Sequence, residues 1–407
     1  RKGRPVVDVI LPEQDITLGA VQFLVLEGNL GEVEVKGNKW FEDDMLREQV
    51  RVDSGEVVQG RSLREDIDWL NRNPFRSVDV LLRPGAEEGL VDMVLQVRDM
   101  RPYRFYAGYE DSGNDLTGTT RWIAGFNWGN AFVPDGQLNY QFTSSSEFDR
   151  LQAHAFSYLA PLPWRHTITT FGSISTTDVE DMGFEVDGTN SQLGFRYGIP
   201  LPAVDLPRYE HEINFGFDYK KAEDNVIFGV LSPLDTETEI GQFALGYRAG
   251  LKDPYGRTNF EVNGYYNPGA IFNLTSTHEY RAVRAGADEQ YFYARLDAER
   301  ETLLPRDFIL RNELVYQEAN TNLLPSEQLG FGGYYSIRGF DPRALTSTDE
   351  GWYLRNELRG PAMHLGPTFN CPGMNDELRP LIFVDYGLAK RYETLPGEDP
   401  RVTMSSF

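Results

Sequence analysis

The sequence has few cysteines, few histidines and no long apolar run, and each shortage excludes a class of protein. The single Cys371, between Asn370 and Pro372, cannot form an internal disulfide, so we expect it in a loop without a special role. The 5 histidines are scattered, and no pair has metal-ligand spacing, so we expect no metal site and no cofactor. No segment reaches the roughly 18 to 20 apolar residues of a spanning helix. A closed β-barrel is then the remaining way to cross a membrane.

Basic residues are also scarce, with 39 Lys and Arg against 62 Asp and Glu and a formal net charge of −23. Nucleic acids need clusters of basic residues, so we expect no nucleic-acid partner. No glycine-rich phosphate loop opens a helix, and no G-x-S-x-G turn occurs, so we expect no catalytic residue and no enzyme. The chain begins at Arg1 without a signal peptide, which an envelope protein needs, so the sequence predicts a processed chain or a fragment.

The first hundred residues predict a small α/β module. Hydrophobic periodicity indicates a strand, two helices and two further strands, at 32–35, 42–50, 61–73, 78–82 and 91–97. Exposed strand edges of such a module can accept an extended polypeptide by strand addition. A structural spacer is the alternative that the residues leave open.

From residue 102 onward, segments of about ten residues alternate between polar and apolar side chains, which is typical of a transmembrane barrel. We count roughly 13 or 14 strands where bacterial barrels close with an even number, and we expect the C-terminus to be truncated. Short proline-rich connections alternate with longer polar ones, which we expect at about 176–188, 220–236, 267–281 and 318–349. A soluble all-β protein, the alternative on composition, has no reason to segregate its connections in this way.

Two short motifs stand near the end of this region. The segment 330–345 is rich in glycine and aromatic residues and contains Arg338, whose guanidinium is a rigid fork for a carboxylate. By itself it reads equally well as an ordinary external loop. In the strand 379–390, alternation places Phe383, Asp385 and Gly387 on one face and more apolar residues on the other.

These motifs resemble those of two-partner secretion transporters, in the outer-membrane superfamily that joins POTRA domains to a β-barrel. The segment 70–97 resembles the second half of a POTRA domain, 11–38 the junction between two such domains, and 103–122 the first hairpin of the barrel. The loop residues Ile337, Arg338, Gly339 and Phe340 match the family's (V/I)RG(F/Y) loop-tip motif. The strand residues Phe383, Asp385 and Gly387 match its FxDxG barrel-wall motif.

The resemblance implies an α+β POTRA module followed by an all-β antiparallel transmembrane β-barrel, which has sixteen strands in the family. Residues 1–19 would be the tail of a first POTRA domain and a linker, 20–101 a second POTRA domain, and 102–407 the barrel, with a large inward-folding loop at 318–349. It also implies that Arg338 pairs with Asp385 in the lumen, with Glu357 as a further acid within reach. The long stretch 361–378 departs from the family, where a short turn is expected.

The function implied is a monomeric pore in the outer membrane of a diderm bacterium, in contact with lipid and with its POTRA module in the periplasm. The module would recognise an unfolded exoprotein, which the pore would secrete. The alternative is a factor of the same superfamily that inserts other barrels into the outer membrane. A plain diffusion porin does not explain the α/β module.

Overall fold

The computed structural model describes residues 5, 7–10, 24–113, 117–181, 184–202, 209–228, 231–269, 276–340, 346–364, 376–394 and 397–407. Cys371 and most of the predicted segment 1–19 lie outside the described residues. The chain divides into two compact units. The first joins Arg1–Phe105 with Phe126–Asn139, and the second joins Tyr106–Gly125 with Tyr140–Phe407.

The first unit contains the α/β module. Its sheet has the order β3-β5-β4, with β3 parallel and β4 antiparallel to β5. The elements are β3 (Asn29–Lys36), α1 (Asp43–Arg47), α2 (Gly60–Leu70), β4 (Arg76–Pro84) and β5 (Leu90–Asp99). Strands β1 (Val7–Ile10) and β2 (Leu24–Glu27) form a separate antiparallel pair. The order of elements is the predicted one.

Both helices are shorter than predicted. Helix α2 ends at Leu70 and not at residue 73, because the Asn71 side chain pairs with the backbone of β4. Its Nδ2 donates to the Val78 carbonyl oxygen at 3.0 Å, and its Oδ1 accepts from the Val78 N–H at 2.7 Å. A side chain that binds backbone groups in this way competes with helix continuation.

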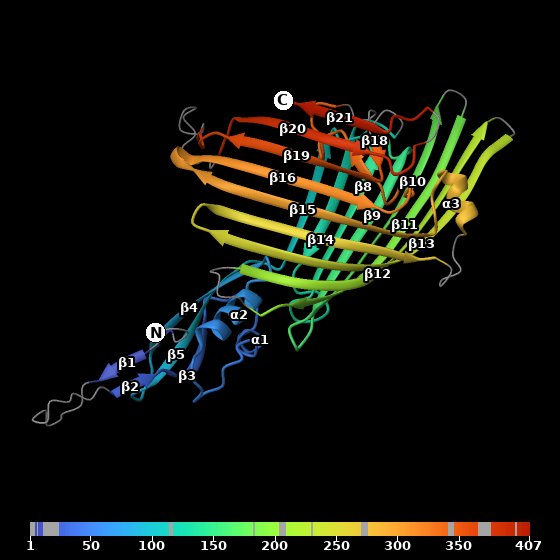
Figure 1. Ribbon diagram of the computed structural model, residues 1–407. Helices are drawn as coiled ribbons and strands as arrows, with labels where there is room; N and C mark the ends of the chain where they lie inside the picture. The colour runs from blue at the N-terminus through green and yellow to red at the C-terminus, as the bar shows by residue number, and fades with distance from the viewer. Residues whose placement is uncertain are drawn as a thin grey trace, which may run out of the picture. The chain divides into compact units, whose positions relative to one another are not determined.

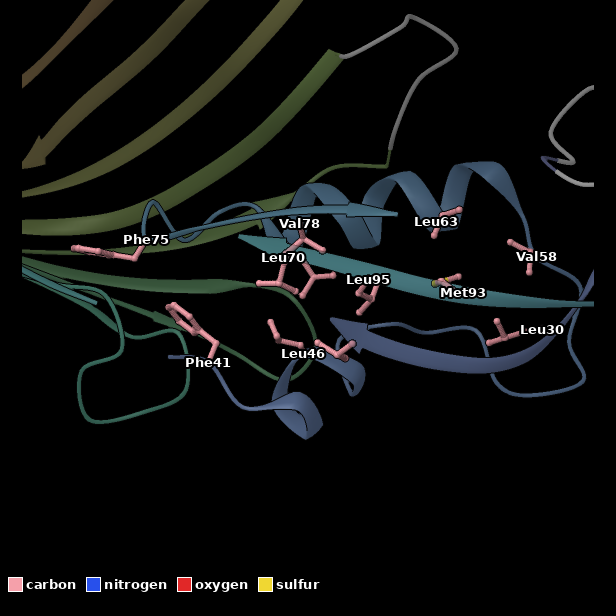
Figure 2. Close-up of a cluster of buried hydrophobic side chains, with 12 residues drawn as sticks. Leu30, Phe41, Leu46, Val58, Leu63, Leu70, Phe75, Val78, Met93 and Leu95 are labelled. Carbon is pink, nitrogen blue, oxygen red and sulfur yellow. The ribbon is translucent and has the colours of Figure 1, made fainter. Parts of the chain in front are cut away.

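The core of this module lies between the helices and the sheet. Figure 2 shows Leu70 of α2, Leu46 of α1 and Leu95 of β5 among the side chains gathered there. Leu63 and Leu70 stand seven positions apart and are both buried, so α2 turns one face to the sheet. Burying a leucine contributes about 1.5 to 3 kcal/mol, so this apolar face is what fixes the helices in place.

A buried ion pair also stabilises the first unit. The guanidinium of Arg76, at the start of β4, donates to both oxygens of Asp135 at 2.6 and 2.7 Å. Its Nε donates to the carbonyl oxygen of Leu70 at 2.7 Å. The Arg76 side chain is fully buried, so loss of either charge would leave the other one unpaired in the interior.

The second unit is built on an antiparallel sheet, which has 14 strands in the described part of the chain. From β6 to β16 the strands follow one another in sequence, and β19, β20 and β21 continue the sheet. Figure 1 shows the sheet curling round from β9 to β20. The strands are β6 (Tyr103–Glu110), β7 (Arg121–Trp128), β8 (Gln137–Ser145), β9 (Leu151–Pro161), β10 (Thr167–Asp181), β11 (Phe184–Pro200), β12 (Tyr209–Phe228), β13 (Leu231–Asp253), β14 (Gly256–Pro268), β15 (Gln290–Leu304), β16 (Phe308–Ala319), β19 (Glu350–Arg359), β20 (Leu381–Lys390) and β21 (Arg401–Ser406).

Smaller elements lie in the connections. They are α3 (Thr277–Val283), the 3₁₀ turn η1 (Pro305–Asp307), and the short strands β17 (Leu329–Phe331) and β18 (Thr346–Thr348), which pair with each other. Helix α3 begins with a capping box between Ser276 and Glu279. Among the described residues, no helix is long and apolar enough to cross a membrane. The large antiparallel sheet confirms the predicted fold class and the count of roughly 13 to 14 strands.

Two of the predicted long loops are wrong. Strands β10 and β11 continue through most of 176–188, and β12 and β13 through most of 220–236. These segments are rich in polar residues, among them Asp178, Glu180 and Asp187, which is why their sequence reads as loop. The strands satisfy their backbone groups by pairing with each other, whatever their polar content. The segments 267–281 and 318–349 do contain long connections, between β14 and β15 and between β16 and β19.

The two faces of β20 differ as alternation predicts. Ile382 is 69% exposed and Val384 is 56% exposed, whereas Asp385 is fully buried. An exposed apolar face suits contact with lipid, and the opposite face is covered by protein. What covers it is the loop between β16 and β19.

Candidate functional site

The connection 320–349, here called the large loop, folds against one face of the sheet. Phe331 and Ile337 of the loop are fully buried. They pack in one apolar cluster with wall residues of β16, β19 and β21, among them Val315, Tyr353 and Met404. The ring of Phe331 meets that of Tyr353 edge-on, with centroids 5.9 Å apart. This packing holds the segment around Ile337 against the wall.

At the tip of this segment, Arg338 is bound by two carboxylates of the wall. Its Nε and Nη2 donate to the two oxygens of Asp385, both at 2.8 Å, and its Nη1 donates to Glu357 at 2.6 Å. The Arg338 backbone N–H adds a bond to Asp385 at 3.0 Å. Since Asp385 is fully buried and Arg338 is 12% exposed, these bonds are shielded from water, where charge-assisted pairs are strongest.

The register of β19 and β20 brings the acids together. Glu357 lies opposite Phe383, and Arg355 lies opposite Asp385 two positions along. Glu357 also accepts from the Nε of Arg359 at 2.6 Å. The hydrogen bond to Asp385 raises the pKa of the Arg338 guanidinium above its ordinary value, against the opposing effect of burial, and Glu357 raises it further. The two carboxylates therefore stabilise the charged form of Arg338.

The other two residues of the barrel-wall motif also contact the loop. The Phe383 ring lies under the guanidinium of Arg338, with its centroid 4.0 Å from Cζ, in a cation–π contact. Gly387 leaves room for the loop, because a Cβ built there would lie 2.3 Å from Cδ1 of Ile337 and 3.2 Å from the Phe331 ring. Phe383 thus contributes an aromatic face, Asp385 a negative charge and Gly387 the space that Ile337 needs.

In the loop-tip motif, the glycine has a backbone reason of its own. Gly339 has φ of +81°, a conformation that other residues adopt only with strain. Phe340 packs at the edge of the apolar cluster. The structure thus brings together every residue singled out in the two motifs, and Glu357 with them.

Sequence reasoning missed a second buried acid, Glu327, at the base of the large loop. Its oxygens accept hydrogen bonds from Nζ of Lys220 at 2.6 Å, the Tyr293 hydroxyl at 2.8 Å and Nε2 of Gln242 at 3.0 Å. Burial by itself would raise the pKa of Glu327, but the charge of Lys220 and these hydrogen bonds outweigh it and lower that pKa. The surrounding segment LPSEQLG shows no pattern that marks Glu327 as a contact residue.

A third buried acid closes the loop at its other end. Asp349 accepts from Nη2 of Arg284 at 3.0 Å, from the Leu323 N–H at 2.8 Å and from the Tyr392 N–H at 3.2 Å. It therefore joins the two ends of the large loop with the segment after α3 and the connection between β20 and β21. Among the described residues, no three His, Cys, Asp or Glu side chains lie close enough to hold a metal ion.

Comparison with known proteins agrees with this architecture. The family described as haemolysin secretion/activation protein ShlB/FhaC/HecB matches residues 89–201 and 272–405. The outer membrane transporter CdiB-2 of Burkholderia pseudomallei (strain 1026b) is 23% identical over 383 residues, covering 90% of this chain and 63% of CdiB-2. The heme/hemopexin transporter protein HuxB of Haemophilus influenzae is 23% identical over 400 residues, covering 95% of this chain and 67% of HuxB. The chain thus spans about two thirds of the length of these relatives.

Solved structures show the same fold. CdiB from Escherichia coli superposes with a TM-score of 0.82 at 18% identity, covering 100% of this chain and 73% of CdiB. BamA from Haemophilus ducreyi, lacking POTRA domains 1–3, gives a TM-score of 0.51 at 13% identity, over 96% of this chain and 78% of BamA. The fold of the large sheet is therefore that of the outer-membrane β-barrels CdiB and BamA. The chain belongs to the ShlB/FhaC/HecB family of haemolysin secretion/activation proteins, which are transporters of the bacterial outer membrane.

Proposed function

We propose that this chain is the translocation part of a pore that recognises an unfolded exoprotein and secretes it across the outer membrane. In this proposal residues 20–101 are a POTRA module in the periplasm, the segment from 102 onward is the barrel, and the pore works as a monomer without catalysis. The observation that carries it is the Arg338 contact with Asp385 and Glu357, which fixes a large loop against the barrel wall. In this proposal the contact keeps the loop in a defined place while no client is passing.

The module would bind its client along the edge strand β4. The other edge strand, β3, is partly covered, because its residue Leu30 exchanges hydrogen bonds with Gly55 and Glu56, both at 2.7 Å. In the described sheet, β4 has no strand beyond it. Asn71 occupies the backbone of β4 only at Val78, so Val80–Pro84 is the stretch to which an extended client would add.

Transport by this route uses no nucleotide and no metal. The client would enter extended, pass beside the large loop and fold outside, so that it could not return. Arg338 acts in this scheme as a pin of the loop and not as a contact of the client. Its charge is neutralised by two carboxylates, which leaves the guanidinium little capacity to bind anything else.

The test is secretion by intact cells. The full-length protein is expressed in a strain that lacks it, together with the exoprotein encoded beside it, and exoprotein in the medium is measured. We expect secretion by the wild type and its loss in Arg338→Ala, with the barrel still inserted. Arg248→Ala is the matched control, because it also removes an arginine from a carboxylate pair but at a site that is 61% exposed.

An opposite pattern would identify an assembly factor instead. In that case loss of the protein would deplete other barrels from the outer membrane, and the exoprotein would reach the medium without it. BamA shares the fold at 13% identity, which shows the architecture alone. Quantifying several unrelated outer-membrane barrels in the same cells therefore separates the two functions.

A further inference from the structure

The base of the large loop has its own attachment to the barrel, apart from the contacts of Arg338. The Glu327 side chain is fully buried. Besides Lys220, Gln242 and Tyr293, the hydroxyl of Ser326 donates to it at 3.0 Å. Four donors satisfy its two oxygens, which is the condition under which a buried carboxylate is stable.

This attachment uses a different part of the wall from the tip. Lys220, Gln242 and Tyr293 lie on β12, β13 and β15. Arg338 is held by β19 and β20, on the other side of β16 in the sheet order. The two ion pairs share no side chain, so either can break without removing a partner from the other.

The donors to Glu327 are themselves held in place. Gln242 accepts at its Oε1 from the Tyr291 hydroxyl at 2.9 Å. Gln317, at the end of β16, donates through one Nε2 to the carbonyl oxygens of Glu327 and of Asp349, both at 3.1 Å. Arg295 in turn donates to Gln317 Oε1 at 2.6 Å. The base is thus a closed network that joins both ends of the loop to the wall.

Between the base and the tip the backbone bends at two glycines. Gly332 has φ of +101° and Gly333 has φ of +82°, values that side-chain-bearing residues rarely adopt. They follow β17, which is paired with β18, and precede the segment that carries Arg338. We call this place the joint between the segment attached through Glu327 and the segment that carries Arg338; Phe331 just before it and Ile337 after it pack in the same cluster on the wall.

We infer that Glu327 is a positioning residue that fixes the base of the large loop, so that the tip can detach from the wall at the Gly332–Gly333 joint while the base stays. Under the proposed secretion function, the loop makes room for the client by moving its tip. Only this consequence rests on that function. Because Glu327 keeps the base in place, the tip returns to the same position on the wall. Loss of Glu327 frees the base, and loss of Arg338 frees the tip.

The test measures thiol reactivity at one buried position in each part of the loop. In the full-length protein in liposomes, with Cys371→Ser, a single cysteine replaces Leu324 at the base or Ser336 near the tip, which are 3% and 5% exposed. We expect Arg338→Ala to raise the labelling rate at position 336 at least about tenfold and to leave that at 324 nearly unchanged. We expect Glu327→Gln to raise the rate at 324 by a similar factor, since about 1.4 kcal/mol corresponds to tenfold.

Lys221→Ala is the matched control for the base. Lys221 follows Lys220 on the same strand, is 30% exposed and pairs with Glu223 and Glu237, so its loss should change neither rate. A reversed pair, Lys220→Glu with Glu327→Lys, should restore protection at 324 relative to either single change. If Glu327→Gln fails to insert, Lys220→Met takes its place, because it leaves the carboxylate its other donors.

Two results would overturn the inference. One is that Arg338→Ala exposes positions 336 and 324 equally, because base and tip would then be one unit. The other is that an inserted Glu327 or Lys220 variant leaves 324 protected. A general loss of stability would expose both positions, and so differs from the expected pattern. Labelling needs no client, so a failure of the secretion function would leave these results unchanged.

Discussion

Replacing Arg338 by alanine should release the tip of the large loop from the barrel wall. The change removes three side-chain hydrogen bonds, two to Asp385 and one to Glu357, and leaves only the backbone N–H bond to Asp385. Asp385 is fully buried and Glu357 is 13% exposed, so both would lose their shared cation away from water. Removing one partner of a buried pair costs about 3 to 5 kcal/mol.

This loss of free energy lowers the fraction of molecules in which the tip is docked. At about 1.4 kcal/mol per factor of ten, the ratio of docked to undocked tip should fall roughly 10²- to 10⁴-fold. The remaining backbone bond and the packing of Ile337 favour the lower end of this range. Arg338→Lys should lie between the wild type and alanine, because lysine keeps the charge but lacks the fork that binds Asp385 and Glu357 together.

The assay is maleimide labelling of a cysteine at position 336 in the full-length protein, with the barrel checked by its heat-modifiable mobility on gels. The labelling rate should rise in the order wild type, Arg338→Lys, Arg338→Ala. If the rate in Arg338→Ala stays within about twofold of the wild type, the ion pair does not hold the loop. The packing around Ile337, and not the buried ion pair, would then be what fixes the tip.

Three further predictions follow from the same contacts. Gly387→Ala should overpack the cluster at Ile337 and weaken docking by about 1 to 3 kcal/mol, and adding Ile337→Ala should recover part of the loss, both read by labelling at position 336. Arg76→Ala should destabilise the first unit by about 3 to 5 kcal/mol, because Asp135 would be left unpaired; denaturant unfolding followed by tryptophan fluorescence measures it. The folded protein lowers the pKa of Glu327. Its carboxylate therefore stabilises the fold fully at any pH above the ordinary glutamate pKa of about 4.3, and this stabilisation is lost only as the pH falls through the lower pKa of the folded protein. Hydrogen exchange of the peptide 320–330, corrected for its intrinsic rate, should therefore show equal protection at neutral and mildly acidic pH; protection already fading above the ordinary value would contradict this.

Sequence patterns were informative where one face of an element is buried. The alternation at Ile382 to Asp385 predicted which side of β20 is covered, because the strand period is two and only one side meets protein. The hydrophobic periodicity of 61–73 likewise predicted a helix, and its buried residues Leu63 and Leu70 lie on the face of α2 that packs on the sheet. Where a strand is rich in polar residues, as at the end of β10 and the start of β11, the same reasoning assigned a loop.

Some residues of the candidate site could likewise be predicted from the sequence, and one could not. The resemblance placed Arg338 and Asp385 in motifs and Glu357 within reach, so these three residues could be predicted. The guanidinium of an arginine also binds carboxylates well, which supported the pairing. Glu327 could not be predicted, because its partners Lys220 and Gln242 stand 107 and 85 positions away in the chain. Nothing local marks an acid that becomes buried through such distant contacts, so only the folded structure identifies it.

Uptake into liposomes shows whether this protein is a secretion pore whose large loop takes part in transport. The full-length protein is reconstituted, the unfolded N-terminal domain of the neighbouring exoprotein is offered from one side, and protease protection of that domain is measured. We expect uptake by the wild type, loss of uptake in Arg338→Ala, and normal uptake in Arg248→Ala. Absence of uptake by the wild type, with faster insertion of an added unfolded barrel protein instead, would contradict the claim and identify an assembly factor.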